Sequence, residues 1–298
     1  MIQHWEGSFT GDRGAELYYQ SWYPQAKPLA TLILVHGLGS HSGTFETAID
    51  YLVPLGYAVY GFDLRGHGRS QGQRGHINAW SEFRTDLGIF WQLVTQREPL
   101  LPHFLLGHSL GSAIALDYAL HHPEGLQGVV ATALPLGKVG VPPLKLAIGQ
   151  LLSQVWPHFT LNTGIDRTAI SRDPEVVAAA DSDRLRHTRG SARLATEFLT
   201  MAEWLQTHAC CLQVPLLLMH GSEDRISPLQ ASRVFFKQVV CADKVKYEYE
   251  GGYHDIHHDL NYQKVLADLE HWLRQHLDSS PNSCGLTAST MMEVCTKI

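Results

Sequence analysis

The sequence predicts an α/β fold with a mostly parallel central sheet, flanked by helices and interrupted by one helical insertion. Short apolar runs alternate with segments of helical periodicity through most of the 298 residues. Most of these runs are continuously apolar, which is typical of parallel strands buried on both faces. The alternation stops between about residues 137 and 208 and then resumes. A chain of this length is sufficient for one large domain that carries an insertion.

The apolar runs give the expected strands of the sheet. Those of its parallel part are residues 30–35, 57–62, 104–106, 128–131, 215–219 and 245–249. Residues 245–249 alternate in polarity and fit a strand nearer an edge, and residues 15–22 predict an additional, antiparallel strand at one edge. Helical periodicity predicts helices over residues 80–96, 112–121, 229–240 and 256–277.

Residues 137–207 are expected to form a helical cap on a core made of residues 1–136 and 208–277. No strand pattern is visible in this insertion, and ligands bind at the carboxyl ends of strands in open sheets of this type. One amphipathic face is predicted from the apolar residues that recur at helical spacing, namely Leu144, Ile148, Leu151, Leu152 and Val155. It is expected to line a lipophilic pocket or to touch a membrane surface; the alternative is packing on the core. Residues 278–298 turn polar and small, which predicts a disordered tail.

The segment around Ser109 predicts a nucleophile. An apolar run leads into Gly107-His108-Ser109-Leu110-Gly111, and a helix-forming segment follows at once. Between a strand and a helix, this Gly-x-Ser-x-Gly pattern is typical of a sharp turn whose strained backbone requires small flanking residues. An ordinary strand-to-helix turn is the alternative. The context favours a nucleophilic serine that projects from the top of the sheet.

Serine needs a histidine base, and the histidine needs a carboxylate that orients it. Glu223 and Asp224 lie on the loop after residues 215–219, and we favour Asp224, although both acids could simply solvate the loop or cap the next helix. Among 18 histidines, His254 is set apart because it follows a strand on a loop with two glycines. The chain order Ser109, Asp224, His254 is the order expected for this architecture.

Two backbone N–H groups are candidates for binding the oxyanion that forms during attack by the serine. One belongs to Leu110, directly after the nucleophile. The second is expected from the loop after an earlier strand, where His36-Gly37-Leu38-Gly39 follows residues 30–35. Backbone donation from Leu38 fits, because the flanking glycines let a substrate approach closely.

Several of these segments together resemble the serine α/β-hydrolases, in the branch that contains monoacylglycerol lipases and lysophospholipases. The similarity runs from about residue 14 to residue 277 and is carried by residues 36–43, 63–70, 107–111, 221–224 and 253–254. It implies an α/β-hydrolase fold with a helical cap, and residues 171–176 look like part of that cap. It also implies that the positions of Ser109, Asp224 and His254 form a catalytic triad. By the same resemblance, those of Leu38 and Leu110 form the oxyanion hole.

The resemblance further implies cofactor-independent hydrolysis of esters with a single acyl chain, such as monoacylglycerols or lysophospholipids. Monoacylglycerol lipases usually carry an acid and an arginine, which help to hold the glycerol head, where this chain has Ser40 and Thr44. This departure bears on the preference for monoacylglycerols, not on the hydrolytic chemistry. An aminopeptidase, an acyltransferase and a non-catalytic ligand receptor on the same fold stay open as alternatives.

Composition and charge narrow the class of protein. A net charge of −6 and a pI of about 6.3 argue against a nucleic-acid partner. No signal peptide and no run long enough to span a bilayer is visible, so we expect a cytoplasmic protein. Any membrane contact would be peripheral and through the cap. The five scattered cysteines are then expected to be reduced thiols.

No motif predicts a cofactor or a metal. The glycine-containing segments 37–39 and 66–70 do not complete a nucleotide-binding pattern, and no Walker lysine follows them. The cluster of His254, His257, His258 and Asp259 lacks a His-Glu-x-x-His helix, and its first member is better used by the triad. Asp63 is expected to be structural, because Ser109 occupies the nucleophile position.

Overall fold

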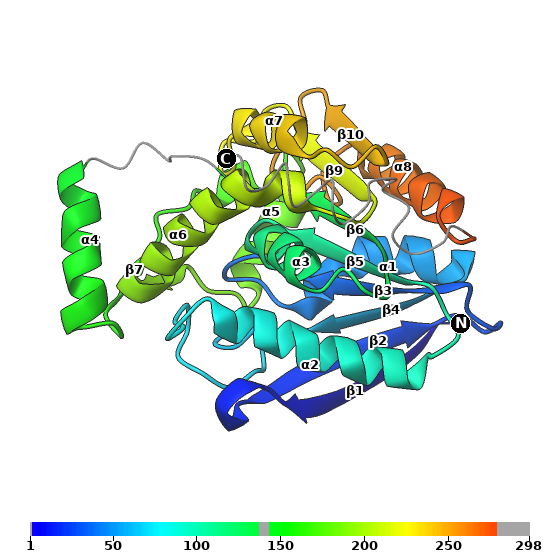
Figure 1. Ribbon diagram of the computed structural model, residues 1–298, viewed down its shortest axis with the longest axis horizontal. Helices are drawn as coiled ribbons and strands as arrows, with labels where there is room; N and C mark the ends of the chain where they lie inside the picture. The colour runs from blue at the N-terminus through cyan, green and yellow to red at the C-terminus, as the bar shows by residue number, and fades with distance from the viewer. Residues whose placement is uncertain (1, 137–142, 279–298) are drawn as a thin grey trace.

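An eight-stranded sheet forms the centre of the molecule, in the order β1-β2-β4-β3-β5-β6-β9-β10. The computed structural model describes residues 2–136 and 143–278 (Figure 1). Strand β1 (Gln3–Thr10) pairs antiparallel with β2 (Glu16–Tyr23), which pairs antiparallel with β4. The other pairings in this sheet are parallel. The predicted α/β architecture is confirmed.

The predicted strands of the parallel part are all present. They are β3 (Ala30–Val35), β4 (Tyr57–Phe62), β5 (His103–His108), β6 (Leu126–Thr132), β9 (Leu216–Gly221) and β10 (Lys244–Tyr249). All of these except β10 are buried along their whole length, which explains their uninterrupted apolar pattern. The strand predicted over residues 15–22 is antiparallel, but it is not at the edge. The mostly exposed β1 covers it, and exposure removed the apolar signal that would have revealed β1.

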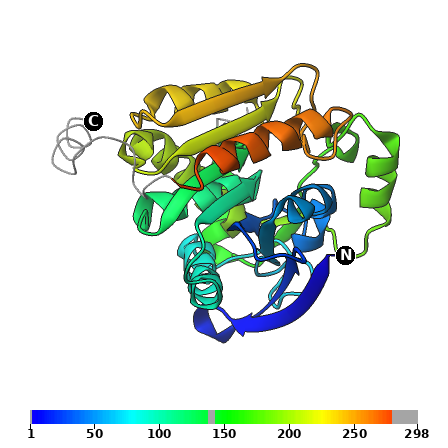
Figure 2. The same cartoon turned by 90° about the vertical axis from the view of Figure 1, so that its right-hand side faces the viewer.

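Helices cover both faces of the sheet. The helices of the α/β core are α1 (Glu46–Leu52), α2 (Ser81–Arg97), α3 (Leu110–His121), α7 (Leu229–Gln238) and α8 (Tyr262–Gln275). Figure 2 shows helices on either side of the sheet. One apolar cluster contains residues of α2, α3 and α7, and the other contains residues of α1 and α8. Short 3-10 helices span Asp12–Gly14, Ser42–Phe45, Val53–Leu55, Arg167–Ala169 and Ala209–Cys211.

Helix α8 begins later than the pattern predicts, at Tyr262 rather than at residue 256. Before it, the Asp259 carboxylate accepts hydrogen bonds from the backbone N–H groups of Tyr253, Arg172 and Leu260. These bonds hold the preceding residues in a turn, so a local side chain competes with the helix for the backbone. The same carboxylate pairs with the Arg172 guanidinium at 2.9 Å.

The segment between β6 and β9 contains three α-helices in its described part, α4 (Pro143–Val155), α5 (Pro174–Ser182) and α6 (Ala192–His208). Helix α4 stands at the end of the molecule beside α6, away from the central sheet (Figure 1). The expectation that this segment holds no strand is wrong, because β7 (Thr160–Asn162) and β8 (Arg189–Ser191) form a two-stranded antiparallel sheet. Strands of three residues are too short to show periodicity.

Parts of two predictions lie outside the described residues: 137–142 of the predicted cap, and 279–298 of the predicted tail. Of the helices in the described ranges, none combines the length and the apolar character needed to cross a bilayer.

The expectation of reduced thiols is wrong for two cysteines. Cys211 and Cys241 are disulfide-bonded. Cys211 ends the 3-10 helix η5 (Ala209–Cys211), which contacts α7, and Cys241 follows α7 shortly after that helix ends. Cysteine spacing alone cannot reveal such bonds.

Candidate active site

Ser109 occupies a strained turn between β5 and α3. Its backbone dihedral angles are φ 52° and ψ −123°, a conformation that non-glycine residues rarely adopt. A Cβ atom on Gly107 would lie 2.2 Å from the Gly111 carbonyl oxygen, and one on Gly111 would lie 2.0 Å from the Val35 carbonyl oxygen. Both positions therefore require glycine. The strain and these close approaches are those of a nucleophile elbow.

Asp224 and His254 meet at the carboxyl ends of β9 and β10. The His254 Nδ1 atom lies 2.8 Å from Asp224 Oδ2, and both side chains are buried. The other carboxylate oxygen accepts hydrogen bonds from the backbone N–H groups of Ile226 and Ser227, at 2.8 and 2.9 Å. Because the carboxylate is held from two sides, it fixes the imidazole with Nδ1 as donor and leaves Nε2 as the base.

The two side chains shift each other's pKa in opposite directions. Burial alone lowers the pKa of His254, but the hydrogen bond and the charge of Asp224 outweigh it and raise the pKa above its usual value. Burial also favours the neutral form of Asp224. The hydrogen bonds from His220 and His254 overcome it and hold the pKa of the Asp224 carboxyl far below its usual range. Asp224 is therefore ionised and stabilises a protonated His254.

Ser109 and His254 line the same cavity, of about 80 Å³, beneath the α5–β8 segment. No hydrogen bond joins these two described side chains. They are related by the cavity that both of them line. Ile170, Ala180 and His187 of the segment between β6 and β9 close the cavity from the other side. Hydrogen bonds of catalytic groups are often long without substrate and tighten when it binds.

The two oxyanion candidates flank the nucleophile. Leu110 is the first residue of α3, directly after Ser109, and Leu38 lines the cavity. A Cβ atom on Gly37 would lie 3.1 Å from Ser109 Cβ, so the loop after β3 passes close to the elbow. Among the described residues, nothing accepts a hydrogen bond from the Leu38 N–H group. This N–H is available to a ligand, as an oxyanion hole requires.

Glu223, the alternative to Asp224, and Asp63, the expected structural acid, both lie outside the cavity lining. Glu223 is exposed and does not line the cavity. Asp63 is buried and accepts hydrogen bonds from the backbone N–H groups of Ser42 and Arg69, at 2.7 and 2.8 Å. It ties the two neighbouring loops together, as expected of a structural residue.

Three further residues around the site gave no signal in the sequence. The His220 Nε2 atom lies 3.2 Å from Asp224 Oδ2, and Asp255 and Arg186 line the cavity. The Asp255 carboxylate accepts a hydrogen bond from His108 Nε2 at 2.9 Å. His220 is the next-to-last residue of β9, and Asp255 directly follows His254, so chain proximity was the only available clue. Arg186 had none, because it comes from a segment without periodicity.

His108, His254 and Asp255 each present an atom of a type that binds metals, all within 4.8 Å of one another. His108 Nε2 is already bonded to Asp255 Oδ1, and His254 Nδ1 is bonded to Asp224. A metal ion bound by His108 Nε2 and Asp255 Oδ1 would break the hydrogen bond between them, whereas the bond of His254 Nδ1 to Asp224 fixes the imidazole as an acid and base requires. The arrangement therefore suits proton transfer better than metal binding.

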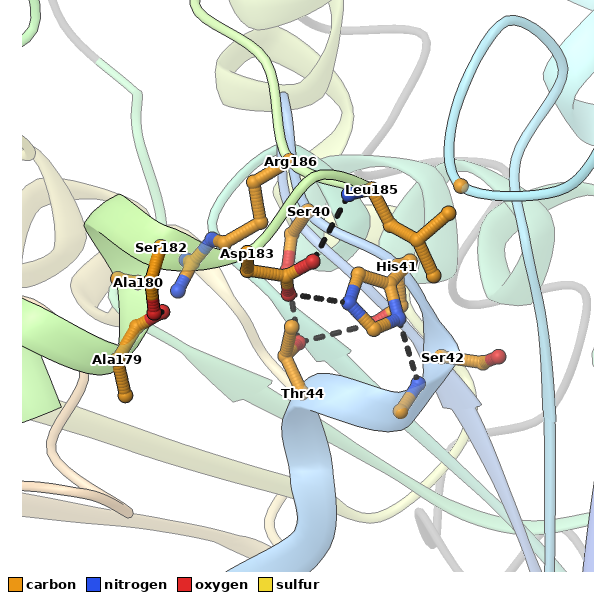
Figure 3. A network of polar contacts seen from close by, with 12 residues as sticks. Ser40, His41, Ser42, Thr44, Ala179, Ala180, Ser182, Asp183, Leu185 and Arg186 are labelled. Carbon is orange, nitrogen blue, oxygen red and sulfur yellow. Dashed lines mark hydrogen bonds and ion pairs between the residues drawn. The ribbon is translucent and has the colours of Figure 1, made fainter.

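A polar network joins the loop after β3 to the segment that follows α5 (Figure 3). His41 Nε2 donates to the Asp183 carboxylate at 2.7 Å, and the same carboxylate accepts the backbone N–H of Leu185. Nearby, the Ser40 and Thr44 hydroxyl groups are 2.7 Å apart, and Thr44 also donates to the His41 carbonyl oxygen. Ser40 and Thr44 thus bond within their own loop.

Comparisons with known proteins extend these findings. The family model of the serine aminopeptidases S33 matches residues 26–261. The chain is 32% identical over 274 residues to a monoacylglycerol lipase of Mycolicibacterium smegmatis, covering 91% of this chain and 98% of the relative. It is 34% identical over 271 residues to an abhydrolase domain-containing protein of Dictyostelium discoideum, covering 89% of this chain but only 28% of that longer protein.

The fold also resembles a solved structure closely. A soluble variant of the monoglyceride lipase of Saccharomyces cerevisiae, in complex with a substrate analogue, superposes with a TM-score of 0.82. The two are 25% identical, and the match covers 91% of this chain and 94% of the yeast protein.

The sheet topology and the serine elbow define an α/β-hydrolase, and the comparisons agree. The chain belongs to the serine aminopeptidase S33 family, in the branch that includes the monoacylglycerol lipases, and it is a serine hydrolase.

Proposed function

We propose that this protein hydrolyses carboxylic esters of lipids with a single acyl chain, of the monoacylglycerol or lysophospholipid type. Ser109 acts as the nucleophile, His254 as the general base and acid, and Asp224 as the group that orients His254. The observation that carries the proposal is the cavity in which the strained Ser109 and the Asp224-bound His254 face the same space. The relatives named above support the lipid substrate.

In the first half of the reaction, His254 Nε2 takes the hydroxyl proton as Ser109 Oγ attacks the ester carbonyl carbon. The tetrahedral intermediate carries its negative charge on the former carbonyl oxygen, which the N–H groups of Leu38 and Leu110 bind. His254 then gives the proton to the alkoxy oxygen. The carbon–oxygen bond breaks and the alcohol leaves, with the acyl group on Ser109.

In the second half, water replaces the alcohol. His254 takes a proton from the water, whose oxygen attacks the acyl-enzyme carbonyl carbon, and the proton then returns to Ser109 Oγ as the fatty acid leaves. The raised pKa of His254 suits both halves, because the imidazolium is stabilised while it holds the proton. No cofactor or metal takes part in these proposed steps.

The substitution Ser109→Ala tests the proposal. We expect it to abolish labelling by a fluorophosphonate probe and to lower kcat for a monoacylglycerol by roughly 10⁶-fold, as for loss of the nucleophile in another serine hydrolase. Ser112→Ala is a suitable control, because this nearby buried hydroxyl bonds the Ser109 carbonyl oxygen and lies outside the cavity lining. Probe labelling at a different residue in Ser109→Ala would contradict the assignment.

Substrate assays separate ester hydrolysis from the alternatives. Faster cleavage of aminoacyl amides than of esters would indicate an aminopeptidase, and acyl transfer to added alcohol in preference to water would indicate an acyltransferase. Tight ligand binding without turnover would indicate a receptor. Esters of one acyl chain are expected to be the best substrates in a panel that includes all of these compounds.

We also propose that α4 brings the protein into peripheral contact with a membrane surface. Ile148, Leu151, Val155 and the adjacent Trp156 are between 49% and 69% exposed, although they are apolar. Exposed apolar residues grouped on one helix are typical of interfacial contact, whereas packing on the core would have covered them. Leu144 of the predicted face lies outside the described side chains.

Liposome sedimentation tests this contact. The double substitution Leu151→Glu and Val155→Glu should lower the bound fraction, because two carboxylates would have to enter the interface. Gln154→Glu is the matched control, since it adds a charge at an exposed polar position of the same helix. Equal binding by the double variant and by the native protein would contradict the proposed contact.

A further inference from the structure

The position of the leaving alcohol can be placed from the chemistry of the site. If Ser109 attacks the ester and His254 protonates the alkoxy oxygen, that oxygen must lie beside His254. Asp255, the next residue, lines the catalytic cavity and also a second cavity of about 400 Å³. Thr44, Ala180 and Arg186 line both cavities as well. An alcohol that leaves His254 therefore meets the wall that the two cavities share.

Arg186 and Asp255 are the charged groups of this shared wall. Arg186 Nη2 lies 3.8 Å from Asp255 Oδ2, beyond hydrogen-bond length, and the Arg186 side chain is only 19% exposed. Within the described residues, the guanidinium makes no hydrogen bond. Arginine has five N–H donors in a fixed fork, so a largely buried guanidinium without an acceptor is well placed to bind a ligand oxygen.

Asp255 offers the complementary acceptor. One carboxylate oxygen is bonded to His108 Nε2, and the other faces Arg186. Burial raises the pKa of this carboxyl, but the hydrogen bond and charge of His108, with the charges of His254 and Arg186, hold it well below its usual range. A donor and an acceptor a few ångströms apart match the hydroxyl groups of a polyol, each of which can accept and donate.

The charge of the second cavity distinguishes between kinds of alcohol. Among the described residues that line it, the carboxylates are Glu46, Asp173, Glu175, Asp183 and Asp255. Arg186 is the one arginine or lysine among those same described lining residues, and it faces Asp255. A phosphate group would enter a region of net negative charge, whereas uncharged hydroxyl groups would not be repelled.

We propose that Arg186 and Asp255 form a subsite that selects an uncharged, hydroxylated alcohol portion of the ester. Arg186 donates to one hydroxyl oxygen, and Asp255 accepts from a hydroxyl group of the same alcohol. Ser40 and Thr44 are not required for this contact, because their hydroxyl groups bond each other and the His41 carbonyl oxygen. The inference rests on the proposed ester hydrolysis and narrows its substrate.

The test compares two esters of one fatty acid, the glycerol monoester and the ethyl ester, which differ in the hydroxyl groups of the alcohol. Arg186→Gln should lower the ratio of their kcat/KM values by about tenfold or more, through a higher KM for the glycerol ester, since a hydrogen bond to a charged group is lost. Arg186→Lys should keep part of the preference. Asp255→Asn should lower the same ratio. Arg184→Gln is the matched control, because Arg184 is exposed and lines neither cavity.

The outcomes distinguish failure of the proposed subsite from failure of the proposed ester hydrolysis. Failure of the native protein to cleave either ester would contradict ester hydrolysis itself. Normal native turnover with an unchanged ratio in Arg186→Gln and Arg186→Lys would overturn only the subsite, as would an equal loss on both esters. Fluorophosphonate labelling confirms that each variant retains its folded site. The phosphate ester of the glycerol monoester should be a poorer substrate than its uncharged parent, and equal or faster turnover of it would also overturn the proposal.

Discussion

At the scale of single residues, Asp224 is the best-anchored group of the site. Its carboxylate contacts two backbone N–H groups, His254 and His220, and it is buried. His220 is itself fixed, since its Nδ1 atom is 2.8 Å from the Ser232 hydroxyl and its Nε2 atom is 2.9 Å from the Ser227 carbonyl oxygen. The proposed base, His254, is therefore oriented by a carboxylate that is held from several sides.

Replacing Asp224 by Asn should reduce kcat by about 10⁴-fold, as for the equivalent change in another serine hydrolase, because the imidazole loses its preferred tautomer. The charge of Asp224 also raises the pKa of His254. A general base works only when deprotonated, so the acid limb of the kcat/KM profile lies above the usual pKa of histidine in the native protein. In Asp224→Asn this limb should move to lower pH.

Steady-state kinetics between pH 5 and 9 measures both effects. Glu223→Gln is the matched control, because the adjacent acid is exposed and should leave both the rate and the profile unchanged. If Asp224→Asn kept kcat within tenfold of the native value, Asp224 would not orient the base.

At the scale of secondary-structure elements, the elbow depends on contact between α3 and the end of β3. Ala at position 111 would place its Cβ atom 2.0 Å from the Val35 carbonyl oxygen and 2.6 Å from that of His36. Both atoms belong to the backbone, so neither can move aside without shifting the sheet or the loop that carries Leu38. The turn that carries Ser109 and the loop that carries Leu38 are therefore one packed unit.

Gly111→Ala should destabilise the protein by about 1–3 kcal/mol or more through overpacking, which corresponds to a fall in Tm of several degrees. Gly149→Ala is the control, because a Cβ atom there meets nothing within 4 Å. In the middle of α4 this change should leave Tm unchanged or raise it, since alanine favours helices by about 1 kcal/mol over glycine. Calorimetry on both variants checks the contrast, and equal Tm values would contradict the steric argument.

Each agreement or difference between the predicted and the observed elements has a physical reason. The bounds of β3 and β4 agree with the pattern, because both strands are buried on both faces. Strand β1 escaped prediction because it is mostly exposed, and β7 and β8 because three residues show no periodicity. In the site, Ser109, Asp224 and His254 were predictable because each follows a recognisable strand. Arg186 was not, since only the folding of the segment after α5 brings it to the cavity.

At the scale of the whole molecule, several histidines are buried in the neutral state. Burial lowers the pKa of His36 to about 3 and that of His187 to about 4, and it holds those of His67 and His257 well below the usual value. The unfolded chain binds protons at these histidines below about pH 6.5, whereas the folded protein does not. Their contribution to stability is therefore present above about pH 6.5 and is lost as the pH falls toward 3 to 4.

The free energy of unfolding should accordingly decrease between pH 7 and pH 5, as measured by urea denaturation. His187→Gln should make this decrease smaller, because it removes a half-buried imidazole that the folded protein keeps neutral. His4→Gln, at an exposed histidine, should leave the slope unchanged. A free energy of unfolding that stays constant from pH 7 to pH 5 would contradict the assignment of these histidines as neutral.

The small volume over Ser109 has a kinetic consequence. About 80 Å³ holds a few water molecules, well below the roughly 300 Å³ at which pockets begin to hold drug-sized ligands. A long acyl chain thus requires the segment between β6 and β9 that covers the cavity to move before attack. The apparent affinity for such a substrate is then lower in proportion to the fraction of protein molecules that are open. Short esters would report the speed of acyl transfer, and long ones the frequency of opening. A plot of turnover against chain length would then measure a conformational equilibrium without any structural probe.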